Sequence, residues 1–290
     1  MKRNPDFENR LNLLGDIFMK LSFGICGVLI LLASLLMLAD AVGQTAENYV
    51  TAHRGNCAEW PENTLDAFRS GINLGCDWIE TDVYLTADGQ LVLIHDASTG
   101  RIAEKNLQVE KSRFDELRAL DVAAGFRKAN NLDLSACPKQ TMPTLGEALD
   151  LILSEKKARL SLQPKCDCVD QIVALVKEKG AEGWVGFNDD SLAKMTRAKE
   201  LLPDAVIFWD RRNSDLTKDI AIALERGFDA LVLHQSDVTT EAVKQIDEAG
   251  LVPGVWTVNG KETIRRFRAF GVRRFYTDTP AEAFAALSKQ

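Results

Sequence analysis

The chain contains 290 residues, of which 46% are hydrophobic and 27% are charged, and its formal net charge at pH 7 is -7. This length suits one large α/β barrel better than two small domains, and the composition is that of an ordinary globular protein. The negative charge argues against a general nucleic-acid binder, because phosphate backbones are held mainly by lysine and arginine. We therefore expect no nucleic-acid partner.

Residues 21–39 form an uncharged, mostly apolar run that Lys20 precedes and Asp40 follows. Its length lies between the core of a signal peptide and a minimal membrane span. Small residues near its end suit cleavage by a signal peptidase, whereas an uncleaved run would be a membrane anchor; a buried core helix is the third alternative. We expect residues 1–43 to be a signal peptide or anchor and residues 44–290 to be one domain. That domain would be periplasmic, secreted or anchored facing outward, with membrane contact only through an uncleaved segment.

From residue 49 onward, apolar strand candidates alternate with amphipathic helix candidates, a pattern typical of parallel α/β folds. Eight strands, each followed by a helix, predict a (β/α)₈ TIM barrel. The strand candidates are residues 49–53, 77–84, 159–163, 184–187, 205–209, 230–234, 252–258 and 274–277. The helix candidates are residues 63–73, 145–154, 169–179, 190–202, 215–226, 240–249, 261–270 and 280–288.

One further strand candidate, residues 91–95, does not fit this count. The connection that precedes it is too short for a parallel crossover and suits a tight hairpin in which Gly89 supplies a positive φ. Such a hairpin places His95 roughly opposite Glu80. Residues 97–142 then form a long polar insertion, with one short helix near its middle, which we expect to cap the pocket at the barrel mouth.

Chemically versatile side chains are concentrated at the ends of the first strands, in a chain with only three histidines. Glu80 and Asp82 lie on one face of a strand, because alternate residues point to the same side. Paired carboxylates suit a hard cation such as Mg²⁺ or Ca²⁺. His53 and His95 beside such a cation could serve as acid and base for cleaving a phosphate ester. A buried salt-bridge cluster is the alternative interpretation.

A set of short motifs occurs in a fixed order along most of residues 50–288. They read HRG, PENT, IETDV, LTADG, HD, WTVN and TDTP, and begin at residues 53, 61, 79, 85, 95, 256 and 277. This set resembles the glycerophosphodiester phosphodiesterase family, a branch of the phospholipase C-like phosphodiesterase barrels. The resemblance implies hydrolysis of a small glycerophosphodiester to glycerol 3-phosphate and an alcohol. It makes His53 and His95 the acid–base pair, and either histidine could take either part.

The same resemblance implies that Glu80 and Asp82 bind a divalent cation, Mg²⁺ or Ca²⁺, and that Arg54 and Lys165 hold the phosphate. The family usually has Glu-x-Lys where this chain has Gln163 and Lys165. Gln163 is therefore expected as a third, uncharged metal ligand. The loss of one negative charge predicts a weaker metal site, or one that takes its last oxygen from water or elsewhere.

Three more residues are candidates for the pocket. Glu62 would lie near the site, or would be a charge that the helix macrodipole favours in a first turn. His234 ends a strand and either faces the mouth or is structural. Trp256 is either a wall for the substrate or a core residue. Two other functions stay open: a phospholipase-type phosphodiesterase acting on membrane lipids, and a non-catalytic headgroup-binding protein, because Gln163 replaces a charged ligand.

The cysteines allow a prediction about the oxidised protein. If the signal is cleaved, five cysteines remain in an oxidising compartment. We expect Cys166 and Cys168 each to pair with Cys57 or Cys137 at the barrel mouth, where the bridges would pin the insertion. Cys76 opens a strand at the other end and is expected to be buried and unpaired.

Overall fold

The computed structural model describes residues 49–288, which belong to a compact unit spanning Asn48–Gln290. The predicted signal peptide or anchor at residues 1–43 lies outside the described residues and stays a prediction. Among the helices of the described part, none is both long and apolar enough to cross a membrane.

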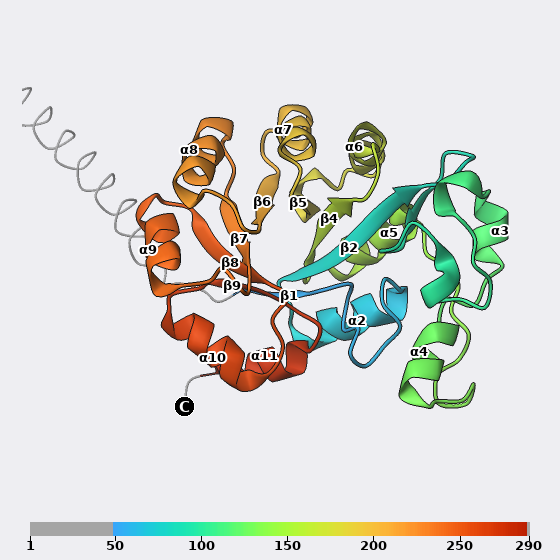
Figure 1. Ribbon diagram of the computed structural model, residues 1–290. Coiled ribbons are helices and arrows are strands. Elements are labelled where there is room, and N and C mark those ends of the chain that lie inside the picture. The colour runs from blue at the N-terminus through green and yellow to red at the C-terminus, as the bar shows by residue number, and fades with distance from the viewer. Residues whose placement is uncertain (1–48, 289–290) are drawn as a thin grey trace, which may run out of the picture. The chain divides into compact units, whose positions relative to one another are not determined.

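Eight parallel strands close into a barrel, as the alternating pattern predicts (Figure 1). Strand β1 (Tyr49–Ala52) pairs in parallel with β2 (Trp78–Leu85) and with β9 (Arg274–Thr277), which joins the first strand to the last. In order from β2 to β9, the strands between them are β4 (Arg159–Pro164), β5 (Val185–Asp189), β6 (Val206–Arg211), β7 (Ala230–His234) and β8 (Val252–Trp256). Every predicted barrel strand is confirmed.

Helices cover the outside of the barrel, and many of them begin at a polar cap. The side chains of Thr64, Thr144 and Ser191 accept the otherwise free backbone N–H groups of the helices that follow them. The helices are α2 (Leu65–Leu74), α5 (Leu145–Glu155), α6 (Val169–Glu178), α7 (Leu192–Leu201), α8 (Leu216–Arg226), α9 (Thr240–Glu248), α10 (Lys261–Ala269) and α11 (Pro280–Leu287).

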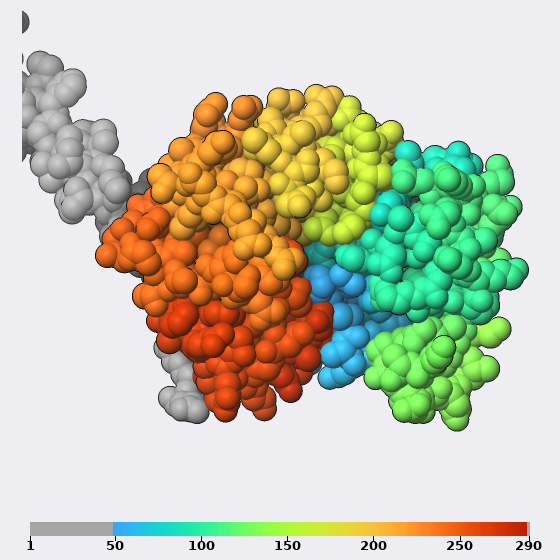
Figure 2. Space-filling view, in the orientation of Figure 1, coloured from blue at the N-terminus to red at the C-terminus, as the bar shows by residue number. Residues whose placement is uncertain are grey.

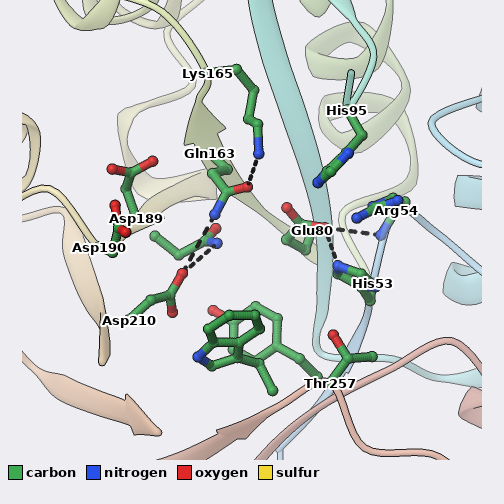
Figure 3. A pocket seen from close by; sticks show the side chains of 13 residues that line it. His53, Arg54, Glu80, His95, Gln163, Lys165, Asp189, Asp190, Asp210 and Thr257 are labelled. Carbon is green, nitrogen blue, oxygen red and sulfur yellow. Dashed lines mark hydrogen bonds and ion pairs between the residues drawn. The ribbon is translucent and has the colours of Figure 1, made fainter. Parts of the chain in front are cut away.

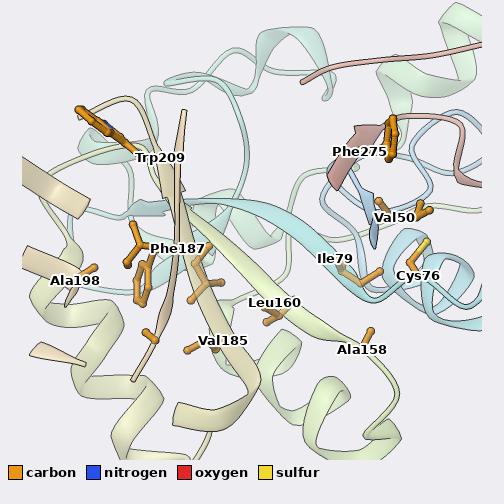
Figure 4. Close-up of a cluster of buried hydrophobic side chains, with 14 of the residues drawn as sticks. Val50, Cys76, Ile79, Ala158, Leu160, Val185, Phe187, Ala198, Trp209 and Phe275 are labelled. Carbon is orange, nitrogen blue, oxygen red and sulfur yellow. The ribbon is translucent and has the colours of Figure 1, made fainter. Parts of the chain in front are cut away.

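The main hydrophobic core lies between the barrel wall and these helices (Figure 4). Alternate strand residues point outward into it, such as Ile79 of β2, Leu160 of β4 and Phe187 of β5, all fully buried. Burying a side chain of this size contributes roughly 1.5–3 kcal/mol. The outward positions therefore stabilise the barrel, and the inward positions at its mouth are available for polar groups.

Aromatic rings around a buried cation fill the barrel interior at the amino-terminal ends of the strands. Arg274 of β9 is 1% exposed, and its guanidinium lies 3.4 Å from the ring centroid of Phe208 and 4.8 Å from that of Trp78. It also donates to the Tyr276 hydroxyl over 3.3 Å. The ring faces stabilise the cation, and these side chains together close the floor of the barrel.

The predicted hairpin is present, with β3 (Leu91–Leu93) antiparallel to β2 and Gly89 at a φ of 83°. Strand β3 ends earlier than expected, and the last hydrogen bond of the ladder runs from Ile94 N to Asp82 O over 3.1 Å. The pairing of Val83 with Leu93 places His95 opposite Thr81, one residue from Glu80 and close to the predicted position.

The insertion after β3 contains two short helices, α3 (Phe114–Arg118) and α4 (Ala124–Asn130), where one was predicted. Helix α4 has no buried residue, so its sequence has no apolar stripe from which a helix could be predicted. The insertion has a small core of its own, built on the hairpin residues Tyr84, Val92 and Ile94. This attachment holds it at the side of the barrel, where it forms a green lobe in Figure 2. None of its described residues lines the main cavity, so the expected cap flanks the pocket instead.

Candidate active site

A polar cavity of about 290 Å³ opens at the carboxyl ends of the barrel strands (Figure 3). Seven of the ten candidate residues line it, whereas Asp82, Glu62 and His234 do not; Asp82 contacts the lining residues Arg54 and Lys165. The lining residues are His53, Arg54, Glu80, His95, Gln163, Lys165, Asn188, Asp189, Asp190, Asp210, Trp256, Thr257 and Tyr276. Parallel strands bring their carboxyl ends to one edge, which is why residues far apart in the sequence meet here.

The turn after β1 connects the first motif to the carboxylates of β2. Arg54 and Gly55 have positive φ values of 56° and 81°, and the backbone N–H of Arg54 donates to Glu80 Oε2 over 2.9 Å. A Cβ atom at Gly55 would lie 2.7 Å from the Cβ of Ala67. Only glycine fits this position, so the Gly in HRG lets α2 approach the turn that presents Arg54.

The PENT motif fixes the second carboxylate. The Asn63 side chain donates to Asp82 Oδ2 over 2.9 Å and accepts a hydrogen bond from the Thr81 hydroxyl over 2.7 Å. Asn63 itself has a φ of 55°, a left-handed conformation that asparagine tolerates better than most residues. Asp82 is therefore oriented by a side chain that sequence reasoning did not single out, although the motif contained it.

Glu62 acts outside the cavity. It accepts hydrogen bonds from Arg54 Nη1 at 3.2 Å and from Arg101 of the insertion at 2.6 and 2.7 Å. It precedes Thr64, the N-cap of α2, so the first-turn interpretation of its charge does not apply. Glu62 therefore helps to fix the Arg54 guanidinium from a position outside the cavity lining. Arg101 also donates to Asp96 over 2.6 Å, which links the insertion to the HD motif.

The two carboxylates of β2 are buried and have different electrostatic surroundings. Burial and the neighbouring Asp82 charge raise the pKa of Glu80 to about 7. Burial alone would raise the pKa of Asp82, but Arg54 and Lys165 outweigh it and lower that pKa. Lys165 Nζ lies 3.5 Å from Asp82 Oδ1, an oxygen that accepts no hydrogen bond. A pair of buried carboxylates with an unsatisfied oxygen fits a hard cation.

Each histidine of the cavity is held by an aspartate. His53 Nδ1 lies 2.7 Å from Asp278 Oδ1, and His95 Nδ1 lies 2.7 Å from Asp96 Oδ1. Nε2 of each ring is left for other contacts, and His53 Nε2 is 4.0 Å from Glu80. Burial would lower the pKa of His53, but the hydrogen bond with Asp278 and the negative charges of Glu80 and Asp278 together outweigh it and raise that pKa. Burial lowers the pKa of His95.

The late motifs WTVN and TDTP supply Asn259 and Asp278, which position His53. Asn259 donates to Asp278 Oδ2 over 2.7 Å and accepts the Asp278 backbone N–H over 2.9 Å. Burial would raise the pKa of Asp278, but the contact with His53 outweighs it and holds that pKa well below its usual range. Asp278 thus remains charged and orients His53. Sequence reasoning did not single it out as a site residue, because only the closure of the barrel brings β9 beside β1.

His53, Cys57 and Asp278 bring three potential metal-ligating atoms within 4.8 Å of one another. Cys57 Sγ donates to Asp278 Oδ1 over 3.2 Å, and burial raises the pKa of this thiol. A thiol binds metal only as the thiolate. The three side chains are therefore a hydrogen-bonded group that orients the imidazole.

Gln163 lies between two charged residues. Its Oε1 accepts a hydrogen bond from Lys165 Nζ over 2.9 Å, and its Nε2 donates to Asp210 Oδ2 over 3.5 Å. Asn188 also donates to Asp210 Oδ2, over 3.3 Å. Burial raises the pKa of Asp210 to about 8. Asp210 was missed in the sequence, but its inward register, two residues after Phe208 on β6, was a signal that could have found it.

Trp256 lines one side of the cavity, and His234 packs against its outer side. The two rings pack edge to face with centroids 5.0 Å apart, and His234 Nδ1 contacts Ser236 Oγ at 2.7 Å. His234 therefore supports Trp256 from outside. The indole N–H of Trp256 is buried and has no hydrogen-bond partner, so the ring offers one donor to a ligand.

All five cysteines in the described part of the chain have free thiols, so the predicted bridges from Cys166 and Cys168 to Cys57 or Cys137 are wrong. Cys57 contacts Asp278, while Cys166 and Cys168 hydrogen-bond to each other. Cys137 lies in the insertion, which sits beside the barrel and does not cover the mouth. The fifth cysteine is buried, as expected.

The profile of the Glycerophosphoryl diester phosphodiesterase family matches residues 53–282. The chain belongs to this family. Membership confirms the resemblance carried by the motifs and identifies the chain as a phosphodiesterase, in a family whose enzymes generally depend on a divalent metal.

Individual members of the glycerophosphoryl diester phosphodiesterase family match most of the chain. A glycerophosphodiester phosphodiesterase of Caldanaerobacter subterraneus subsp. tengcongensis is 29% identical over 80% of this chain and 94% of its own length. The structure of a Silicibacter pomeroyi protein has a TM-score of 0.75 and 25% identity, covering 84% of this chain and 94% of that one. A phosphodiesterase of Oleispira antarctica, solved with the product sn-glycerol-3-phosphate, has a TM-score of 0.73 and 24% identity, covering 83% of this chain and 97% of that one.

Proposed function

We propose that the protein hydrolyses small glycerophosphodiesters to glycerol 3-phosphate and an alcohol, with the help of a divalent cation. The observation that carries this proposal is the meeting, in one cavity, of two aspartate-held histidines, a buried carboxylate pair and the cations Arg54 and Lys165. The product bound by the Oleispira antarctica phosphodiesterase supports glycerol phosphate as one half of the substrate.

Glu80, Asp82 and Gln163 are the residues that would hold Mg²⁺ or Ca²⁺. All three side chains offer oxygen, the donor atom that both ions prefer, and Asp82 Oδ1 accepts no hydrogen bond within the protein. When bound, such a cation stabilises the negative charge that develops on phosphate oxygens.

The protein's own residues bind the diester and move protons. Arg54 and Lys165 would hold the phosphate, because both cations reach the cavity while anchored to Asp82 at 3.4 and 3.5 Å. His53 and His95 would take the proton from the attacking hydroxyl of the substrate and give one to the alcohol oxygen as its bond to phosphorus breaks. Water would then open the resulting cyclic phosphate to give glycerol 3-phosphate, with the histidines moving protons in the reverse sense. Their Nδ1 atoms are occupied by aspartates, which leaves Nε2 of each ring for this transfer.

The lining of the cavity favours a small polar substrate over a membrane lipid. Apart from two aromatic rings, the lining side chains are charged or hydrogen-bonding groups, and none of them is aliphatic. An acyl chain would find no apolar groove among these residues. We therefore prefer the glycerophosphodiesterase to the phospholipase alternative.

The deciding experiment measures glycerol 3-phosphate release from glycerophosphocholine and glycerophosphoethanolamine, with and without a chelator. Turnover that the chelator stops, and that His53→Ala and His95→Ala each reduce by roughly 10²–10⁴-fold, supports the proposal. Cleavage of intact phospholipid with no glycerophosphodiester turnover would favour the phospholipase. Binding of these diesters without turnover would favour the headgroup-binding protein.

A further inference from the structure

We propose that Asp210 supplies the third carboxylate of the cation site and so replaces the charge that Gln163 lacks. The inference rests on the proposed cation dependence and assigns a ligand role to a residue outside the sequence motifs. It predicts that β6, and not β4, carries the last negative charge of the site.

Asp210 lies where it can reach a cation in the cavity. It lies on β6 (Val206–Arg211), is 6% exposed and lines the same cavity as Glu80 and Gln163. Figure 3 shows its carboxylate on the side of the cavity opposite His53, with the amide of Gln163 between the two sides. Asp210 therefore faces the same cavity as Glu80.

Only one oxygen of the Asp210 carboxylate has hydrogen-bond partners. Oδ2 accepts two amide N–H groups, from Asn188 at 3.3 Å and Gln163 at 3.5 Å. Oδ1 is buried and has no hydrogen-bond partner. Leaving such a group unpaired inside a protein is costly. The amides hold one oxygen in place and leave the other for a ligand.

Asp210 also lacks a cationic partner. Among the ion pairs of residues 49–288, the neighbouring aspartates have their own cations: Asp82 has Arg54, and Asp189 has Lys194 at 3.4 Å. No lysine or arginine of that range forms an ion pair with Asp210. A buried carboxylate that lacks a protein cation but opens into a cavity suits a bound cation, because buried charges are paired or coordinate metals.

The side chains at positions 163 and 210 are coupled by a hydrogen bond. The amide of Gln163 directs its oxygen to Lys165 and its nitrogen to Asp210. A glutamate at 163 would instead bring a second carboxylate to within about 3.5 Å of Asp210, and like charges this close repel in a buried site. The uncharged amide at position 163 avoids this repulsion, so Asp210 can carry the negative charge of the site alone.

The test is calorimetric titration of Ca²⁺ and of Mg²⁺ into chelator-stripped protein without substrate, so the readout does not depend on turnover. We expect Asp210→Asn to weaken cation binding by roughly 10–100-fold. The matched control is Asp190→Asn, which removes a charge from an exposed residue of the same cavity and should change the dissociation constant less than about threefold, since exposed charges are screened.

A double-mutant cycle completes the test. Gln163→Glu in the Asp210→Asn background should restore affinity to near that of the wild type, because it returns one carboxylate to the site. Melting curves in chelator verify folding, and Asp210→Ser is the second variant should the asparagine form not fold. Unchanged cation affinity in Asp210→Asn, or an equal effect of Gln163→Glu in both backgrounds, would overturn the proposal. If the proposed diesterase function is wrong, the wild-type protein will show no turnover of glycerophosphodiesters, whatever the cation titrations show.

Discussion

The contact between His53 and Asp278 leads to a quantitative prediction. Asp278 accepts hydrogen bonds on both oxygens: His53 and Cys57 contact Oδ1, and Asn259 donates to Oδ2. Asparagine at 278 has one acceptor oxygen and one NH₂ group. Either Asn259 or His53 would then face a donor, and the imidazole would lose its fixed tautomer and orientation.

The expected size follows from the role of the histidine. Acid–base catalysis contributes roughly 10²–10⁴-fold. Because Asp278→Asn keeps His53 but disturbs its orientation, we expect kcat to fall on the order of 10²-fold, which is about 2.7 kcal/mol at 1.36 kcal/mol per decade. KM should change little, since Arg54 and Lys165, which we propose to hold the phosphate, do not contact Asp278.

The assay is steady-state hydrolysis of glycerophosphocholine, with kcat and KM measured separately. Cys57→Ser is the matched control, because serine keeps a donor for Asp278 Oδ1 and should leave kcat nearly unchanged. A folded Asp278→Asn enzyme with kcat within threefold of the wild type would refute the orienting role. A rise in KM alone would point to substrate binding instead.

Three further predictions follow from separate features. Gly55→Ala should lower the free energy of unfolding by at least about 1–3 kcal/mol, measured by urea denaturation, because φ is 81° and the added Cβ meets Ala67; an unchanged midpoint contradicts this. Burial would raise the pKa of Asp121, but Arg127 outweighs it and lowers that pKa, so this carboxylate contributes stability above the unfolded pKa near roughly 4 and loses it as pH falls. Asp121→Asn should therefore lower the melting temperature at pH 7. The difference in melting temperature between wild type and variant should narrow below about pH 4, and a difference that stays the same at all pH values would contradict this prediction. Fractionation of expressing cells should find the domain outside the cytoplasm, and a cytoplasmic protein with intact residues 1–43 would disprove export.

The barrel could be predicted from the sequence because each strand and each helix has its own regular spacing of apolar residues. The strand ends then follow, since a parallel barrel brings them to one edge. This geometry explains why His53, Glu80 and Lys165 could be grouped in advance. The roles assigned to these residues remain predictions until the variants are measured.

Contacts that depend on closure and register could not be predicted in the same way. Asp278 and His53 are 225 residues apart and meet only because β9 pairs with β1. The disulfide prediction failed for a related reason: being near the mouth does not fix Cα separations, and the insertion follows its own small core to the side. Asp210 looked like an ordinary strand-end aspartate until its burial was known.

The packing around Arg274 also has a kinetic consequence. The guanidinium among the rings of Trp78, Phe208 and Tyr276 makes the cavity blind at its inner end, so reactants and products share a single opening. The half of a cleaved diester that lies deeper must depart second. That product, and not the one nearer the exit, is the molecule that should accumulate on the enzyme and compete with incoming substrate.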